Sequence, residues 1–116
     1  MTKQHKKKLD DLWGKIIRSK GRCELCGKMR LLQAHHFFSR IHTATRWDLD
    51  NGFCLCSGHH KFWAHRDAPE FTLWAIRKRG HNWYKLLSIK KRTICKSDYE
   101  LINAYLKGWE NGKEII

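Results

Sequence analysis

Two pairs of metal-binding residues, each with a two-residue gap, constrain the fold of this 116-residue chain more than any other feature. The first pair is Cys23 and Cys26, which Gly27 follows, and the second pair is Cys56 and His59. Four ligands with a majority of thiolates are typical of closed structural zinc sites, where metal binding contributes directly to the free energy of folding. We therefore predict a structural Zn²⁺ bound by Cys23, Cys26, Cys56 and His59.

Two alternatives remain open for these cysteines. Cys54 would share one side of a strand with Cys56 and can replace it as a ligand, although the gap to His59 favours Cys56. A redox-active C-x-x-C motif at Cys23 would need a helix that starts at this residue, and the pattern does not predict one. Cys95 has no partner near it in the sequence, and we expect it to be a buried free thiol.

The chain is strongly basic. It carries 24 Lys and Arg residues against 11 Asp and Glu residues, a net charge of +13. Such an excess favours a polyanionic partner, because side chains that neutralise phosphates release counterions. No apolar run is long enough to cross a membrane, and no apolar stretch of a signal peptide follows the basic N-terminal residues. Since the cysteines are spaced for metal binding rather than for disulfides, we expect a cytoplasmic protein.

Hydrophobic periodicity predicts an N-terminal helix over residues 6–20, because Leu9, Trp13 and Ile17 recur on one face. We assign this helix to core packing. The apolar runs that follow are short, and they predict these elements: a strand or hairpin arm within residues 29–40, a loop over 42–50, a strand over 52–55 and a short helix over 59–65.

The C-terminal half has helical patterning. Asp67 and Gly80 are suited to the two ends of one helix, Asn82 to the start of a second, and Ser97 with Glu100 to a capping box that opens a third. These signals predict helices over residues 67–79, over residues 83–91 and from residue 97 to Gly112. The residues expected to face the core are Phe71, Trp74, Ala75, Tyr84, Leu86, Leu87, Leu101, Ile102, Tyr105, Leu106 and Trp109.

Three further histidines suit phosphate chemistry. Once His59 is assigned to zinc, His35, His36 and His60 remain in the central region, with Asn51 between them. A neutral imidazole can take a proton from water near neutral pH, and a divalent ion can polarise a phosphate. An amide side chain can hold the loop that aims the base.

The order of His35, His36, Asn51 and His60, interleaved with the two zinc pairs, resembles that of the HNH endonucleases with the ββα-metal fold. The segment ATRWDLDNGFCLCSGHHKFWAHRDAPEF, residues 44–71, is also similar to small HNH proteins carried by bacteriophages. The resemblance covers residues 23–71. It implies a zinc-stapled ββα-metal core at 23–66. The length favours one domain over residues 1–116. With the helix at 6–20 and a helical extension at 67–116, the expected fold class is α+β.

The resemblance also implies an activity and roles for these residues. The activity is hydrolysis of DNA with a divalent ion, Mg²⁺, Mn²⁺ or Ni²⁺. His36 would be the general base, His35 and His60 would bind the divalent ion, Asn51 would orient the base through its loop, and Asp48 would help to fix that loop.

Two histidines close to this motif, His65 and His42, have no assigned role. His65 lies five residues after His60, about 140° around an α-helix from it at ~100° per residue, which makes it a doubtful ligand. His42 is expected to be a solvent-exposed loop residue.

For DNA contacts we expect Arg40, Arg46 and Lys61 to hold phosphates beside the scissile bond. The main alternative to a nuclease is a zinc-stapled DNA-binding accessory module without catalysis, which would need the charge and the zinc site but not the histidines.

Overall fold

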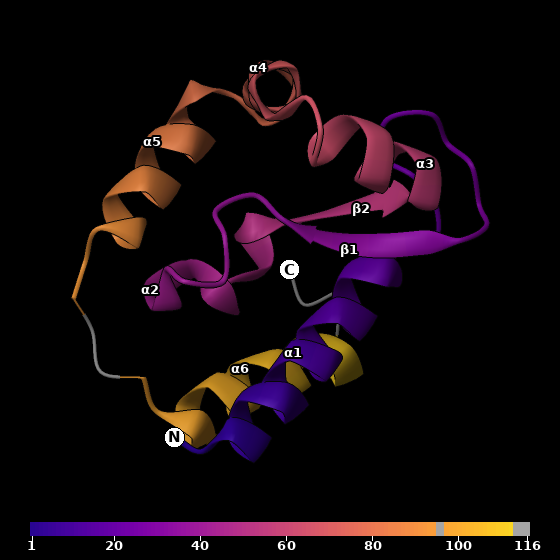
Figure 1. The fold of residues 1–116 in the computed structure, drawn as a ribbon. Coiled ribbons are helices and arrows are strands. Elements are labelled where there is room, and N and C mark those ends of the chain that lie inside the picture. Colours follow the sequence, from indigo (N-terminus) through magenta and orange to yellow (C-terminus); the bar gives the residue numbers. More distant parts are fainter. Residues whose placement is uncertain (95–96, 113–116) are drawn as a thin grey trace.

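The computed structural model describes residues 1–94 and 97–112 and has an α+β architecture (Figure 1). Cys95, the expected free thiol, and residues 113–116 of the expected helical extension lie outside the described residues. None of the helices in the described part of the chain combines the length and the apolar character needed to cross a membrane.

The long helix α1 comes first, short helices and two strands alternate between residues 32 and 64, and longer helices follow. The elements are α1 (Lys3–Arg18), β1 (Leu32–His36), α2 (Thr43–Arg46), the 3₁₀ turn η1 (Leu49–Asn51), β2 (Gly52–Cys56), α3 (Ser57–His59), the π-helical turn η2 (His60–Ala64), α4 (Ala68–Arg79), α5 (His81–Lys91) and α6 (Tyr99–Gly112).

Strands β1 and β2 pair antiparallel, with Leu32 opposite Cys56 and His36 opposite Gly52. All five residues of β2 are buried, because helices cover both faces of the pair. Two strands alone are marginally stable in water. The hairpin therefore depends on the packing layers around it.

The two packing layers use alternate residues of β2. Phe53 and Leu55 pack with Phe71 and Ala75 of α4, while Cys54 faces the other layer. That second layer joins α1, the residue after α2 and α6 through Leu9, Trp13, Ile17, Trp47, Cys54 and Leu106. Figure 1 shows α1 and α6 side by side on one side of the hairpin, with α4 and α5 on the other.

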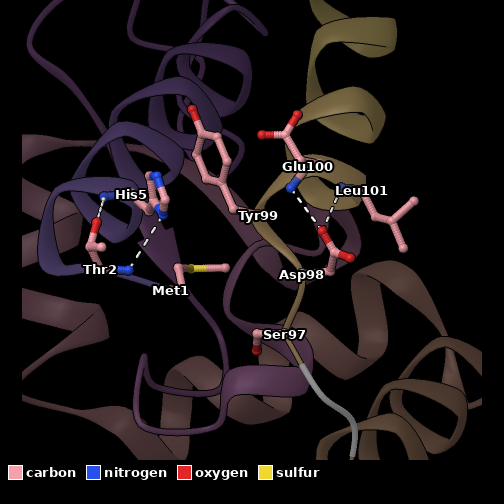
Figure 2. Close-up of a pocket in the computed structure, with 8 residues that line it drawn as sticks. All are labelled: Met1, Thr2, His5, Ser97, Asp98, Tyr99, Glu100 and Leu101. Carbon is pink, nitrogen blue, oxygen red and sulfur yellow. Dashed lines mark hydrogen bonds between the residues drawn. The ribbon is translucent and has the colours of Figure 1, made fainter.

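Residues at the starts of α1 and α6 contact each other. Thr2 and His5 form a reciprocal capping box, and the His5 ring stacks on Tyr99 with centroids 4.1 Å apart (Figure 2). Asp98 accepts hydrogen bonds from the amides of Glu100 and Leu101. The capping box explains why α1 begins at Lys3 rather than at residue 6; α1 ends at Arg18, two residues earlier than predicted.

Two predicted boundaries are wrong for local reasons. The expected loop over residues 42–50 contains α2 and the start of η1, which the Asp48 side chain caps by accepting from the Asp50 amide at 2.9 Å. Helix α5 begins at His81 rather than at residue 83, because Gly80 adopts a positive φ of 96° and lets the next helix start at once.

The predicted inward faces of α5 and α6 are only partly correct. Leu87 and Leu106 are buried, but Leu86 is 68% exposed and Leu101 is 71% exposed. For α6 the reason is that this helix packs along α1, so only one narrow face of α6 is covered. Tyr105 and Trp109 are 42% and 39% exposed, so neither is fully buried.

Close packing at Gly52 gives a test of the fold. A Cβ there would lie 2.8 Å from Trp13 Cζ2 and would overlap the Ile17 side chain, both of which are buried. Gly52→Ala should lower the free energy of unfolding by about 1–3 kcal/mol, the usual cost of overpacking. Gly58→Ala is the control, because nothing lies within 4 Å of a Cβ at Gly58. Urea denaturation measures the free energy of unfolding of both variants. Equal values for Gly52→Ala and Gly58→Ala would contradict the close packing at Gly52.

Candidate active site and metal centres

The four predicted zinc ligands lie together. The ligand atoms of Cys23, Cys26, Cys56 and His59 are all within 4.8 Å of one another. His59 Nδ1 is 3.3 Å from Cys56 Sγ and 3.7 Å from Cys23 Sγ, and Cys26 Sγ is 3.9 Å from Cys56 Sγ. Three thiols and one imidazole at this spacing fit a metal ion such as zinc, which we call the Cys₃His cluster.

A tight turn brings Cys23 and Cys26 to the same side. The Gly27 amide donates to Cys23 O at 2.9 Å, and the Cys23 amide donates to Lys28 O at 2.8 Å. Gly27 has a φ of 78°, a conformation that favours glycine. Burial opposes ionisation of Cys23, but hydrogen bonds from the backbone at Cys26, Cys56 and Leu25 outweigh it and lower the pKa of the thiol to about 6. The turn thus favours a thiolate before any metal binds.

Glu24 attaches this turn to β2. Its amide donates to Cys54 O at 2.8 Å, and its carboxylate accepts from the Cys54 amide at 2.7 Å. Arg79, at the end of α4, donates to the same carboxylate at 3.1 Å and to Gly52 O at 2.6 Å. The turn, the second strand and α4 are therefore held by one set of hydrogen bonds.

Cys54 and Cys56 have different surroundings, because Cys56 is the last residue of β2 and precedes α3 directly. Cys56 Sγ belongs to the Cys₃His cluster, whereas Cys54 is buried in the layer formed with α1. Burial, and then the nearby charge of Glu24, raises the pKa of the Cys54 thiol. Cys56 rather than Cys54 therefore lies with the three other predicted ligands, in a group that could hold a metal ion.

A second group of ligands is formed by His35, His60 and His65, and we call it the three-histidine cluster. Their ligand nitrogens all lie within 4.8 Å of one another. The Nε2 atoms of His60 and His65 are 3.0 Å apart, and the ring centroids of His35 and His60 are 5.1 Å apart. His35 comes from the end of β1 and the other two from the turn of helix after β2.

The expectation that His65 points away from His60 is wrong. The His65 amide donates to His60 O at 3.3 Å, an i to i+5 hydrogen bond that widens the helix into a π turn. The fifth residue then returns to the same side, where an α-helix would have placed Ala64.

Two imidazoles of the three-histidine cluster, those of His35 and His60, resist protonation. Burial, and then the neighbouring His60, His65 and His36, lowers the pKa of His35 to about 3. Burial and His65 also lower the pKa of His60. Neutral imidazoles keep a lone pair for a metal ion, so this donor set can hold one at neutral pH.

His36 lies beside this cluster. Its Nε2 donates to the carbonyl of Arg46 at 2.9 Å, which leaves Nδ1 as the acceptor nitrogen of a neutral ring. The ring stacks on Trp13, with centroids 3.8 Å apart and an interplanar angle of 11°. Burial lowers the pKa of His36 to about 4, although the Arg46 carbonyl and the charge of Asp10 raise it.

One cavity of about 420 Å³ is lined by all four of these histidines. Adjacent residues on a strand normally face opposite sides, but His35 and His36 are at the end of β1, where both reach the cavity. Its other walls include residues of α1 and of the segment that follows β1: Asp10, Trp13, Gly14, Arg18, Ser39 and Arg40.

Asn51 fixes the chain where it leaves β1. The side chain is fully buried; its Oδ1 accepts from the Phe38 amide at 2.8 Å and its Nδ2 donates to Phe38 O at 2.9 Å. Asn51 O also accepts from the Phe37 amide at 2.8 Å. Asp48 lies just before it, and its carbonyl accepts from Trp13 Nε1 at 2.9 Å.

The residues expected to contact DNA differ in their surroundings. Arg40 lies 3.6 Å from Asp10, but its side chain is 63% exposed at the cavity, and Lys61 is exposed on η2. Arg46 is instead held by Asp10 in a two-pronged ion pair of 3.1 and 2.7 Å, and its side chain is only 15% exposed. The prediction that Arg46 presents its charge to a phosphate is therefore not supported by its position. His42, expected to be exposed, is half-buried beside Phe38.

The contribution of α1 to the cavity is not predicted by the sequence pattern. Asp10, Trp13 and Arg18 line the cavity, although they precede the resembling segment and were assigned to a packing helix. Their spacing of three and five residues carries no ligand signal, so only the contact between α1 and β1 reveals them.

No protein-family model, curated protein or solved structure matches this chain. The arrangement of its own residues therefore carries the functional argument. Two features of that arrangement matter: the Cys₃His cluster beside β2, and the cavity with four histidines at the end of β1.

The Cys₃His cluster can be tested with Co²⁺, because thiolates bound to Co²⁺ give an intense charge-transfer absorption that imidazoles do not. Cys26→Ala should weaken this band and lower the affinity of the site, since it removes one of four ligands. Cys54→Ala is the matched control and should leave the band unchanged. A band that depends on Cys54 but not on Cys26 would contradict the assignment.

Proposed function

We propose that this protein is a metal-dependent endonuclease of the HNH class that hydrolyses DNA phosphodiester bonds. The observation that carries the proposal is the convergence of His35, His60 and His65 beside His36 in one cavity. Three imidazoles next to a fourth that keeps a free acceptor nitrogen combine a metal site with a base.

The three-histidine cluster suits a divalent ion. A bound ion there would polarise the scissile phosphate and stabilise the charge that develops on the departing oxygen. Imidazole donors favour transition metals, whereas Mg²⁺ prefers oxygen ligands. Of the ions implied by the resemblance, Ni²⁺ and Mn²⁺ therefore fit His35, His60 and His65 better than Mg²⁺ does.

His36 is the proposed general base. Because Nε2 is engaged with Arg46 O, Nδ1 is the nitrogen that accepts a proton from the attacking water. Burial keeps the imidazole neutral and ready to accept. A phosphate that enters the cavity brings negative charge close to the ring, which raises the pKa of His36 and improves it as a base.

Asn51 and Asp48 have supporting roles in this proposal. Asn51 holds the Phe37–Phe38 backbone next to the base through three hydrogen bonds. Asp48 caps η1 and pairs with Lys90 at 2.6 Å, which fixes the segment that leads into Asn51. Neither side chain is proposed to contact the substrate.

DNA is the proposed partner because of charge. The net charge of +13 favours a polyanion, and Arg40 and Lys61 are exposed near the cavity and on η2. Zn²⁺ in the Cys₃His cluster would have a structural role, since all four positions are filled by protein ligands.

A zinc-stapled DNA-binding module without catalysis is the second candidate. The net charge and the Cys₃His cluster support it equally well, because neither requires the four histidines of the cavity. The two candidate functions predict different effects of a His36 substitution on DNA cleavage.

We expect His36→Ala to lower plasmid cleavage by about 10²–10⁴-fold, the usual contribution of a general base, while DNA affinity is unchanged. Cleavage by the zinc-loaded protein is measured on gels with Mg²⁺, Mn²⁺ or Ni²⁺ added. His81→Ala is the control, because His81 is an exposed histidine at the start of α5. If wild type and His36→Ala leave the plasmid intact with every ion, the protein is a binding module.

The three-histidine cluster is tested by metal affinity. We expect His65→Ala to weaken Ni²⁺ binding to the zinc-loaded protein by at least tenfold, because even the loss of an outer partner of a metal ligand costs about 10–100-fold. Isothermal titration measures the change, with His42→Ala as the control. If His65→Ala binds Ni²⁺ as tightly as wild type does, the π turn does not form part of a metal site.

A further inference from the structure

We infer that Asp10 and Trp13 of α1 position the imidazole of His36 for the proposed reaction. The inference rests on the proposed nuclease function and adds an element that lies outside residues 23–71. Neither side chain is proposed to touch the substrate; both act through His36 and are positioning residues.

Trp13 fixes the plane of the His36 ring. The two rings are nearly parallel, with centroids 3.8 Å apart, and Trp13 is 1% exposed. Trp13 Nε1 donates to Asp48 O at 2.9 Å, so the indole itself cannot rotate without losing a partly buried hydrogen bond. A flat, anchored surface on one side restricts rotation of the imidazole about its χ2 angle.

Asp10 fixes the carbonyl that His36 contacts. Its Oδ1 accepts from Trp47 Nε1 at 2.8 Å and from Arg46 Nε at 3.1 Å, and its Oδ2 accepts from an Arg46 terminal nitrogen at 2.7 Å. Two consecutive side chains are thus tied to one carboxylate. The peptide between them carries Arg46 O, the acceptor of the His36 Nε2 proton at 2.9 Å.

The charge of Asp10 is maintained at neutral pH. Burial opposes ionisation of this carboxyl, but hydrogen bonds from Arg46 and Trp47 and the charges of Arg46 and Arg40 keep its pKa below the usual value. The ionised carboxylate therefore keeps its hydrogen bonds to Arg46 and Trp47, which hold Arg46 O in place as the acceptor of the His36 Nε2 proton.

Helix geometry explains why one element supplies both residues. Asp10 and Trp13 are three residues apart and share one face of α1. Gly14, next in sequence, is buried against β1, and its position would place a Cβ 3.9 Å from the Ala34 side chain. This close approach lets Trp13 reach a ring at the end of β1.

The decisive variant is Asp10→Asn, which keeps the shape of the side chain and removes its charge. We expect kcat at saturating DNA to fall about tenfold, a part of the ~10²–10⁴-fold that a general base provides, while KM is unchanged. Asp11→Asn is the matched control. Asp11 is the next residue of the same helix, pairs with Lys7 on the surface and does not line the cavity.

A double-mutant cycle separates positioning from general destabilisation. If Asp10 acts through His36, Asp10→Asn should have no further effect on the residual rate of His36→Ala. An equal loss in both backgrounds would overturn the inference, because Asp10 would then act independently of the base.

Trp13 is tested with two variants. Trp13→Phe keeps an aromatic surface and should retain most of kcat, whereas Trp13→Leu keeps apolar volume without a ring face and should lose as much as Asp10→Asn. Rates are measured at a temperature where both variants are folded and zinc-loaded. Equal losses in Phe and Leu variants would exclude a role for the stacked ring.

The tautomer of His36 can be measured without DNA cleavage, so it tests the positioning separately from the proposed nuclease activity. Ring ¹⁵N chemical shifts should show one neutral tautomer of His36 in wild type, with the proton on Nε2, and a mixture in Asp10→Asn. If wild type does not cleave DNA but this change occurs, the nuclease proposal fails and the positioning stands. A single unchanged tautomer in Asp10→Asn overturns the positioning whether or not DNA is cleaved.

Discussion

The direct passage of β2 into the helix that follows it is the constraint on which both clusters depend. Cys56 ends the strand, His59 and His60 are neighbours on the next turn, and these two histidines belong to different clusters. A metal ion in the Cys₃His cluster would therefore fix the helix that presents His60 and His65. Since a two-stranded sheet is weak by itself, such a link between strand, turn and helix would stabilise the shape of the cavity.

Support for the proposed base comes from three separate parts of the chain. The α1 helix supplies the stacked ring and the carboxylate, the segment at α2 supplies the carbonyl, and Asn51 holds the backbone after β1. Each contact restrains a different motion, either of the His36 ring or of the backbone next to it. Held in this way, the imidazole would lose little entropy when a substrate arrives, which is how a small site can be pre-organised for catalysis.

Local signals predicted much of the fold. Cysteine and histidine gaps of two residues identified the Cys₃His cluster, and apolar spacing identified α1, both strands and α4. These features depend on residues close in sequence, so they can be read from it. The inward faces of α5 and α6 could not be predicted in full, because Leu86 and Leu101 become exposed through the way their helices are placed.

The sequence by itself determined the two-residue-gap ligands, the strong positive charge and the order of the histidines around Asn51. Only the tertiary structure decided three other points: that His65 joins His60 through a π turn, that Arg46 is tied to Asp10, and that α1 forms a wall of the cavity. The physical reason is the separation in sequence between the residues that interact. A gap of two residues is set by one turn of backbone, whereas the Asp10–Arg46 pair spans 36 residues and exists only once α1 packs against the hairpin.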